Sequence, residues 1–172
     1  MNLTTQRLII RAFDSADKAD VIGYMSDPDV THFLSEGTLD ESGVEHFILN
    51  TNQAFAIEHS ASEKVIGHIE FYPWFGDHTY EMGWVLNPQF QGLGIALEAA
   101  QATLSYGFLT LGIHRVVATA QPENPASYKL MEKLGMVREG HFRQCIPKEN
   151  GVWWDEYFYS ILRSDFDNAN AR

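Results

Sequence analysis

Residues 79–112 read TYEMGWVLNPQFQGLGIALEAAQATLSYGFLTLG. Residues 80–86 of this stretch predict a buried strand, which Asn87-Pro88 closes. Beyond the next turn, apolar side chains recur every three or four residues and predict one long amphipathic helix. They are Leu93, Leu97, Ala100, Leu104, Phe108 and Leu111. Gly112 follows where helices commonly end in a left-handed residue. The stretch therefore predicts a strand, a glycine turn and a helix in direct succession.

The glycine turn is a candidate anion site. A helix that begins after such a turn presents unpaired backbone N–H groups and the positive end of its dipole. Gly92 and Gly94 lack a Cβ, which would let phosphate oxygens approach the backbone, although two glycines can also serve a tight connection alone. No lysine or arginine occurs between Lys64 and Arg115, so we expect backbone amides and the dipole to carry the site.

Two common nucleotide motifs do not fit the turn. It lacks the Gly-Lys-Ser/Thr ending of a nucleotide P-loop. It also lacks the third glycine and the downstream acid of a dinucleotide fingerprint.

Length and composition predict one cytoplasmic domain, residues 1–172. No apolar run approaches the ~20 residues that span a bilayer, and no signal peptide is evident at the start. The single cysteine, Cys145, excludes an internal disulfide and is typical of a reducing compartment.

The net charge is strongly negative, since 12 Lys and Arg minus 23 Asp and Glu gives −11. Such a charge opposes nucleic-acid binding, which depends on phosphate neutralisation. It favours encounter with cationic substrates such as amines, although it can also serve solubility alone.

The chain alternates strand and helix patterns throughout. We expect strands near residues 7–13, 54–58, 65–71, 80–86, 114–119, 137–145 and 153–162. We expect helices near residues 14–25, 39–52, 93–111 and 125–134. Residues 30–37 are expected to be irregular, the Asn150-Gly151 pair favours a hairpin, and the polar residues after Ser164 are expected to fray. No repeat or linker divides the chain.

A second motif lies at residues 124–136, NPASYKLMEKLGM. Asn124 can cap a helix, Pro125 suits its first position and Gly135 suits its left-handed end. Together with the glycine turn, this motif resembles the GNAT superfamily of N-acetyltransferases. The family's Gln/Arg-x-x-Gly-x-Gly/Ala signature for acetyl-CoA is matched by Gln91, Gly94 and Ala96.

The resemblance implies the GNAT fold, of mixed α/β class. In that fold a seven-stranded, mostly antiparallel sheet splays at its centre and about four helices cover both faces. Asn-Pro-Ala-Ser and the ending NGVWWDEYFYSIL most resemble the branch that acetylates the N-termini of ribosomal proteins. The implied activity is transfer of an acetyl group from acetyl-CoA to a primary amine, by direct attack in a ternary complex.

The resemblance also implies the cofactor contacts. The pyrophosphate would sit on the amides of Gly92, Leu93, Gly94, Ile95 and Ala96. Backbone N–H groups near Val85 and Leu86 would bind the pantetheine arm and polarise the thioester carbonyl, where Gly83 is compatible with a bulge. Gln91, Asn124, Ser127 and Tyr128 complete the expected contacts.

Two proton-transfer roles stay open. Glu81 lies close to where several family members place a general base, with Glu70 or an ordered water as the alternatives. The family's usual tyrosine acid falls at Met131, whose thioether cannot donate a proton. The resemblance favours Ser127 instead, with Tyr128 as the competing donor.

The remaining patterns exclude other site classes. The seven histidines show no zinc-ligand spacing with Cys145, so we expect no metal, and no hydrolase elbow occurs. The acceptor is expected to be a protein or peptide N-terminus or a small-molecule amine, and the protein a monomer or homodimer without nucleic-acid or membrane partners. The alternatives are a non-catalytic acyl-CoA sensor, and an acyltransferase for longer chains.

Overall fold

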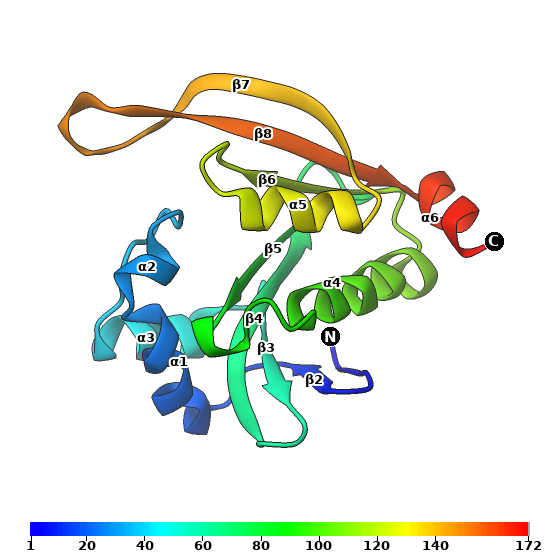
Figure 1. Cartoon of the computed structure of the whole chain (residues 1–172). Helices are drawn as coiled ribbons and strands as arrows, with labels where there is room; N and C mark the ends of the chain where they lie inside the picture. The colour runs from blue at the N-terminus through cyan, green and yellow to red at the C-terminus, as the bar shows by residue number, and fades with distance from the viewer. Residues whose placement is uncertain (172) are drawn as a thin grey trace. The chain divides into compact units, whose positions relative to one another are not determined.

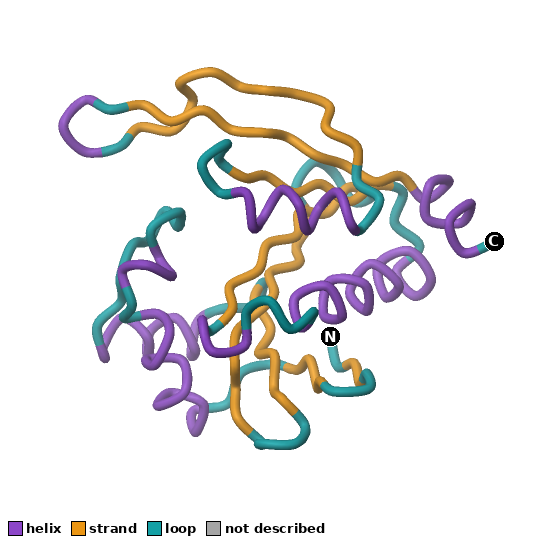
Figure 2. The backbone as a smooth tube through the Cα atoms, in the orientation of Figure 1, coloured by secondary structure: helices purple, strands orange, loops and turns teal. Residues whose placement is uncertain are grey.

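The structure, a computed structural model, describes residues 1–171 (Figures 1 and 2). Its strands are β1 (Leu3–Thr4), β2 (Leu8–Arg11), β3 (Ala54–His59), β4 (Lys64–Pro73), β5 (Thr79–Leu86), β6 (Arg115–Ala120), β7 (Val137–Pro147) and β8 (Trp153–Leu162). Its α-helices are α1 (Lys18–Met25), α2 (Pro28–Thr31), α3 (Glu41–Asn50), α4 (Ile95–Ser105), α5 (Pro125–Lys133) and α6 (Arg163–Asn170). Among these residues, no helix is both long enough and apolar enough to cross a membrane.

The strands form one mixed sheet in the order β1-β2-β3-β4-β5-β6-β8-β7. The predicted class is therefore confirmed, with eight strands in place of seven. The additional strand is the two-residue β1, which pairs with β2 through Leu3↔Ile10 and Thr4↔Ile9. Helices also exceed the expected number, because Pro28 starts the short α2, whose last two residues fall in the segment expected to be irregular, and α6 follows β8.

The chain divides into two compact units, and strands β4 and β5 contribute residues to both. The first unit comprises Met1–Phe71 and Trp84–Thr103, and the second comprises Tyr72–Gly83 and the chain from Leu104 onward. Each unit is described by itself below.

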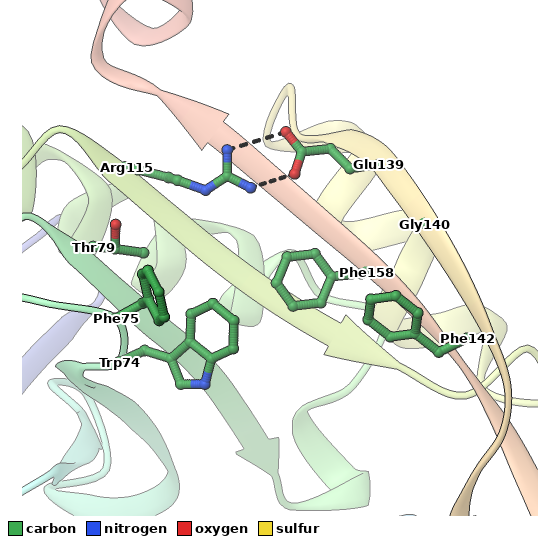
Figure 3. A pocket seen from close by; sticks show the side chains of 8 residues that line it. All are labelled: Trp74, Phe75, Thr79, Arg115, Glu139, Gly140, Phe142 and Phe158. Atoms are coloured by element: carbon green, nitrogen blue, oxygen red, sulfur yellow. Dashed lines mark hydrogen bonds and ion pairs between the residues drawn. The ribbon is translucent and has the colours of Figure 1, made fainter.

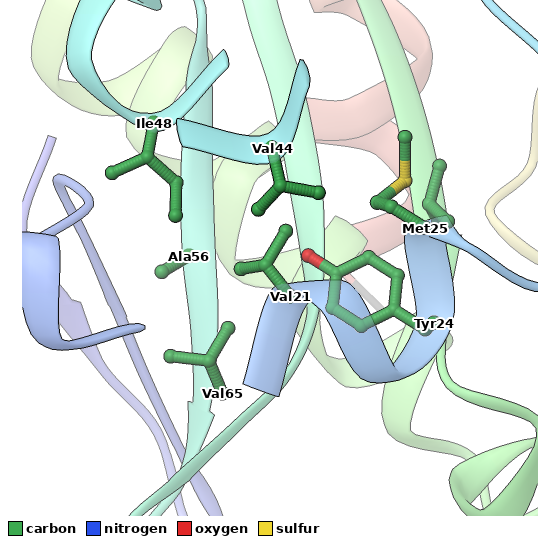
Figure 4. Close-up of a cluster of buried hydrophobic side chains, with 8 residues drawn as sticks. Val21, Tyr24, Met25, Val44, Ile48, Ala56 and Val65 are labelled. Carbon is green, nitrogen blue, oxygen red and sulfur yellow. The ribbon is translucent and has the colours of Figure 1, made fainter. Parts of the chain in front are cut away.

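In the first unit, α1 and α3 cover one face of an antiparallel sheet. Strands β2, β3 and β4 pair in sequence order, with a register shift at Ile57/Glu58. Figure 4 shows the resulting core, in which Val21 and Tyr24 of α1 meet Val44 of α3 and Ala56 of β3, all four fully buried. The apolar positions of both helices thus serve packing.

Helix α4 begins in the first unit, directly after the glycine turn. Its last turns widen into a π-helix, η3 (Tyr106–Leu111), which ends at Gly112 with φ 67°. That left-handed end confirms the predicted cap. The apolar stripe is confirmed only in its middle, because Leu93 and Leu111 are 58% and 41% exposed. Leu93 precedes the first residue of α4, so its side chain does not follow the helical periodicity.

In the second unit, β6 and β8 form an antiparallel pair that β7 extends. Strand β5 pairs in parallel with β6 over three residue pairs only, from Thr79↔Arg115 to Glu81↔Val117. Strand β6 then continues along β8 as far as Ala120, so the parallel ladder ends well before β6 does.

Strands β7 and β8 form the predicted hairpin, drawn as a long ribbon in Figure 1. Asn150 and Gly151 both adopt positive φ, at 58° and 73°, and Lys148 N donates to Val152 O at 2.8 Å. Asn and Gly tolerate this backbone region best, which is why the pair predicts the turn.

The expectation that residues after Ser164 fray is wrong. Helix α6 is held by Phe166, whose ring lies 5.0 Å from that of Phe108, and by Arg163, which donates to Phe108 O. The Asp165 carboxylate also accepts from Leu162 N at 3.0 Å and so caps the helix start. One aromatic contact and two polar ones therefore hold a segment whose composition is mostly polar.

Candidate functional site

The chain turns sharply between β5 and α4, in the first unit. Asn87 caps the short helix η2 (Pro88–Phe90), because its side chain accepts from Gln89 N at 3.0 Å. Gln91 Nε2 then donates to Leu86 O at 3.0 Å and ties the turn to the end of the strand. This contact gives Gln91 a structural role within the signature.

The turn presents a row of unpaired backbone donors. Gly92 and Gly94 have φ of 73° and 77°, a region that L side chains rarely adopt. Within residues 1–171, no hydrogen bond is donated by the N–H groups of residues 92–96, and the first α4 bond runs from Glu98 N to Gly94 O at 3.1 Å. Free N–H groups at the positive end of a helix dipole fit a diphosphate.

Arg7 corrects the expectation that no cationic side chain reaches this turn. Its Nη1 donates to Leu93 O at 2.9 Å, and its Nε donates to Glu98 Oε2 at 2.6 Å. Although desolvation acts in the opposite direction, hydrogen bonds from Thr5 and Arg7 hold the pKa of Glu98 below its usual range. Eighty-six residues separate Arg7 from Leu93, so no local pattern could reveal the contact.

Val85 and Leu86 lie at the buried end of β5, each 7% exposed. Gly67 of β4 permits a close approach there, since a Cβ at Gly67 would lie 2.3 Å from Val85 O and 3.0 Å from Leu86 Cα. The next residue, Asn87, donates its N–H to Ile66 O at 2.8 Å. The close approach of β4 to this end of β5 therefore depends on the missing Cβ of Gly67.

Glu70 and His68 differ in environment although both lie on β4. His68 is 2% exposed, its Nδ1 lies 3.1 Å from the Tyr24 hydroxyl, and burial lowers its pKa to about 4. Rings of Phe13 and Phe47 also face it, which gives Phe47 a packing role. Glu70 is partly buried and pairs in register with Ala54.

Glu81 is the candidate carboxylate in the second unit. It is half-buried near the start of β5, and desolvation raises its pKa above the ordinary value of 4.5. Tyr72 opposes this rise by a hydrogen bond, and the nearby Glu156 carboxylate adds to it. A carboxylate with a raised pKa is a better general base near neutral pH.

Asn124 and Ser127 lie together at the start of α5. Asn124 Oδ1 accepts from Ser127 N at 3.3 Å, which is a helix cap, and the Tyr128 ring stands edge-on to Tyr157 with centroids 5.6 Å apart. Met131, at the place of the family's tyrosine, is 1% exposed and serves the core. Ser127 and Tyr128 remain partly exposed hydroxyls.

The second unit also carries an aromatic groove of about 720 Å³ (Figure 3). Phe158 stands at its centre, with the Trp74 and Phe142 rings 5.5 and 5.6 Å from it. Figure 3 shows the Arg115–Glu139 ion pair at one side. The described residues lining the groove offer no unpaired charge, so its chemistry is apolar contact.

Asp155 on β8 is hydrogen-bonded to two groups of β7. It accepts from His141 at 2.6 Å and from Gln144 N at 2.8 Å. Its neighbour Glu156 is the carboxylate that acts on Glu81. Cys145 is exposed, and desolvation together with Glu156 and Asp155 raises the pKa of its thiol. Among the described residues, no group of three metal-ligating side chains occurs.

Comparison with known proteins identifies the class to which this fold and turn belong. The family model for the acetyltransferase (GNAT) domain matches residues 7–137. The chain therefore belongs to the GNAT acetyltransferases, a family that uses acetyl-CoA. The predicted family and enzyme class are confirmed.

Individual relatives agree with this assignment. An uncharacterized N-acetyltransferase, YnaD of Bacillus subtilis, is 47% identical over 172 residues, covering 97% of this chain and all of the relative. The crystal structure of a GNAT-family acetyltransferase from Bacillus anthracis superimposes with a TM-score of 0.93 at 46% identity, covering 95% of this chain and 99% of that one. A spermidine N(1)-acetyltransferase of Vibrio cholerae is 31% identical over 133 residues, covering 77% of this chain and 76% of the relative.

Proposed function

We propose that residues 1–172 work as one acetyltransferase domain, which transfers the acetyl group of acetyl-CoA to a primary amine in the cytoplasm. The observation that carries the proposal is the row of unpaired N–H groups at residues 92–96, opened by two glycines of positive φ. Each contact between an anion and a helix start contributes about 0.3–1 kcal/mol when exposed, so several must act together. The N–H groups of residues 92–96 provide several such contacts.

In this proposal, the turn amides and those near Val85 and Leu86 hold acetyl-CoA, with Gln91, Asn124, Ser127 and Tyr128 as further contacts. Acetyl-CoA supplies the activated acyl group when it is bound. The chain contributes orientation, exclusion of water and proton transfer. No acetylated enzyme group is needed, because direct attack by the amine in a ternary complex suffices.

Glu81 is the proposed general base. An amine reaches the enzyme protonated, with a pKa of about 8 for an α-amine and about 10.4 for a lysine. A carboxylate whose pKa is raised by burial accepts such a proton more readily than an exposed one. Glu156 adds a second negative charge, which favours a cationic acceptor. Glu70 and an ordered water are the alternatives for this role.

Ser127 is the proposed donor to the departing thiolate, with Tyr128 as the alternative. Both hydroxyls lie within the first turn of α5 and are partly exposed, whereas Met131 is buried. A hydroxyl can donate a proton and a thioether cannot.

The acceptor is proposed to be a small-molecule polyamine or a protein N-terminus. The net charge of −11 and the Glu81–Glu156 pair favour a cationic amine. The Vibrio cholerae relative is named for spermidine, which is such an amine.

The test measures the release of free thiol from acetyl-CoA. The acceptors are spermidine and a peptide with an N-terminal alanine. Turnover on either acceptor supports the transferase and selects its substrate class. Turnover only with a longer acyl-CoA would replace acetyl by that group. CoA binding without turnover on any amine would support an acyl-CoA sensor, the candidate that the buried Met131 favours.

A further inference from the structure

Arg7 connects two parts of the first unit that are distant in the sequence, the start of the chain and the beginning of α4. Its side chain donates to Leu93 O through Nη1 and to Glu98 Oε2 through Nε, at 2.9 and 2.6 Å. Its backbone N–H donates to Glu98 Oε1 at 2.9 Å, and Thr5 Oγ1 donates to the same oxygen at 2.6 Å. We call Thr5, Arg7 and Glu98 the Arg7 clamp.

The Arg7 clamp contacts the glycine turn at the point where the turn's backbone has the greatest conformational freedom. Leu93 lies between Gly92 and Gly94, two residues whose positive φ only glycine adopts easily. Arg7 Nη2 lies 3.5 Å from the place that a Cβ of Gly94 would occupy. A planar guanidinium with donors in a fixed fork can hold a carbonyl and a carboxylate in one geometry.

Charge alone does not explain the clamp. Arg7 is neutralised by its ion pair with Glu98, which stands in the first turn of α4. Glu98 by itself would weaken anion binding at the helix start through like-charge repulsion. The contacts of the clamp therefore point to control of turn geometry rather than to attraction of the phosphate.

We infer that Arg7 is a positioning residue for the donor substrate: through Leu93 O and Glu98 it keeps the free N–H groups of residues 92–96 directed at the diphosphate. The inference rests on the proposed function, since it assumes that acetyl-CoA binds at this turn. It assigns a role to a residue 85 positions before Gly92, outside both sequence motifs.

The test compares CoA affinities by calorimetry on the free protein. Arg7→Ala is expected to weaken CoA binding about tenfold, which equals about 1.4 kcal/mol. Glu98→Ala is expected to weaken it by a similar factor, although removal of a negative charge favours an anion. The double variant should bind like either single variant, because the two residues act as one unit. Unchanged or tighter binding by Glu98→Ala would overturn the inference.

A conservative pair of variants covers the case in which Arg7→Ala does not fold. Arg7→Lys keeps the charge but cannot hold both partners in a fixed fork, so several-fold weaker CoA binding is expected. Arg11→Lys is the matched control, because Arg11 also holds two separate acceptors, the carboxylates of Asp17 and Glu58, in the same unit. Wild-type affinity in Arg7→Lys would overturn the inference.

A truncated donor separates positioning from general damage. Acetyl-pantetheine lacks the diphosphate, so Arg7→Lys should retain wild-type kcat/KM with this donor and lose it, by a raised KM, with acetyl-CoA. Equal losses with both donors would contradict the inference. If the wild-type protein fails to bind CoA at all, the proposed function fails, and that result differs from each of those above.

Discussion

The Tyr24 hydroxyl lies 3.1 Å from Nδ1 of His68 inside the core of the first unit, and both side chains are almost completely buried. Burial lowers the pKa of His68 to about 4, so the imidazole is neutral at pH 7. A histidine whose pKa falls on folding stabilises the protein above its unfolded pKa of about 6.5 and loses that contribution as pH falls toward 4.

We therefore expect the free energy of unfolding to drop by about 3 kcal/mol between pH 6.5 and 4 on account of His68. Urea unfolding at several pH values measures this drop. His68→Gln cannot titrate, so its stability should depend less on pH over the same range. Parallel slopes in wild type and His68→Gln would contradict the assignment.

Gly67→Ala should destabilise the protein. The new Cβ would lie 2.3 Å from Val85 O, so β4 and β5 must separate. Overpacking of a core costs about 1–3 kcal/mol, and contact with backbone places this variant at the upper end. Gly23→Ala is the control, because α1 has open space at that position and Ala favours a helix. Thermal unfolding of both variants measures the contrast, and equal melting temperatures would refute it.

Glu81→Gln should lower the activity of the protein and raise its stability. A carboxyl whose pKa is raised on folding costs stability once pH rises above its unfolded pKa, because the native state disfavours the charge. Removal of that charge should raise the free energy of unfolding at pH 7. If Glu81 is the base, the same change should lower kcat and abolish the acidic limb of the kcat/KM profile.

Glu70→Gln is the matched comparison for Glu81→Gln, because it removes the other candidate carboxylate. An acidic limb that persists in Glu81→Gln and disappears in Glu70→Gln would transfer the base role to Glu70. A limb that persists in both variants would leave water as the acceptor of the proton.

Phe166→Ala should release α6. The ring packs 5.0 Å from Phe108, which is fully buried, and the rest of the helix is polar. We expect a loss of about 1–3 kcal/mol, less than for a fully buried aromatic, and faster hydrogen exchange in residues 163–170. Phe75→Ala is the control, since Phe75 is 77% exposed and should change stability by less than about 0.5 kcal/mol. Equal effects of the two variants would contradict the packing role.

The sequence predicts the elements whose signals are local. Periodicity locates the seven longer strands and four of the helices, and glycines at positions 112 and 151 adopt the left-handed conformation that their context predicts. These features depend on residues within a few positions of each other. The sequence does not predict elements that depend on distant partners. Examples are the short β1, which pairs with β2, and α6, which packs on Phe108.

The same division holds at the site. The glycine turn is predictable because a strand, two glycines and a helix occur in succession. The Arg7 contact is not, because chain folding alone brings residue 7 to residue 93. Burial also depends on residues that are distant in the sequence. The neutral His68 and the raised pKa of Glu81 therefore cannot be predicted from local patterns, because both arise when neighbouring elements exclude water.

Cys145 is a site for selective chemical labelling of the protein. It is exposed, and it is the one thiol in the sequence, so a maleimide dye would couple at a single place on β7. Because the carboxylates of Glu156 and Asp155 and its own desolvation raise its pKa, the thiolate is scarce at neutral pH and labelling should require mildly alkaline buffer. A fluorophore placed there would report on the hairpin without any engineered cysteine.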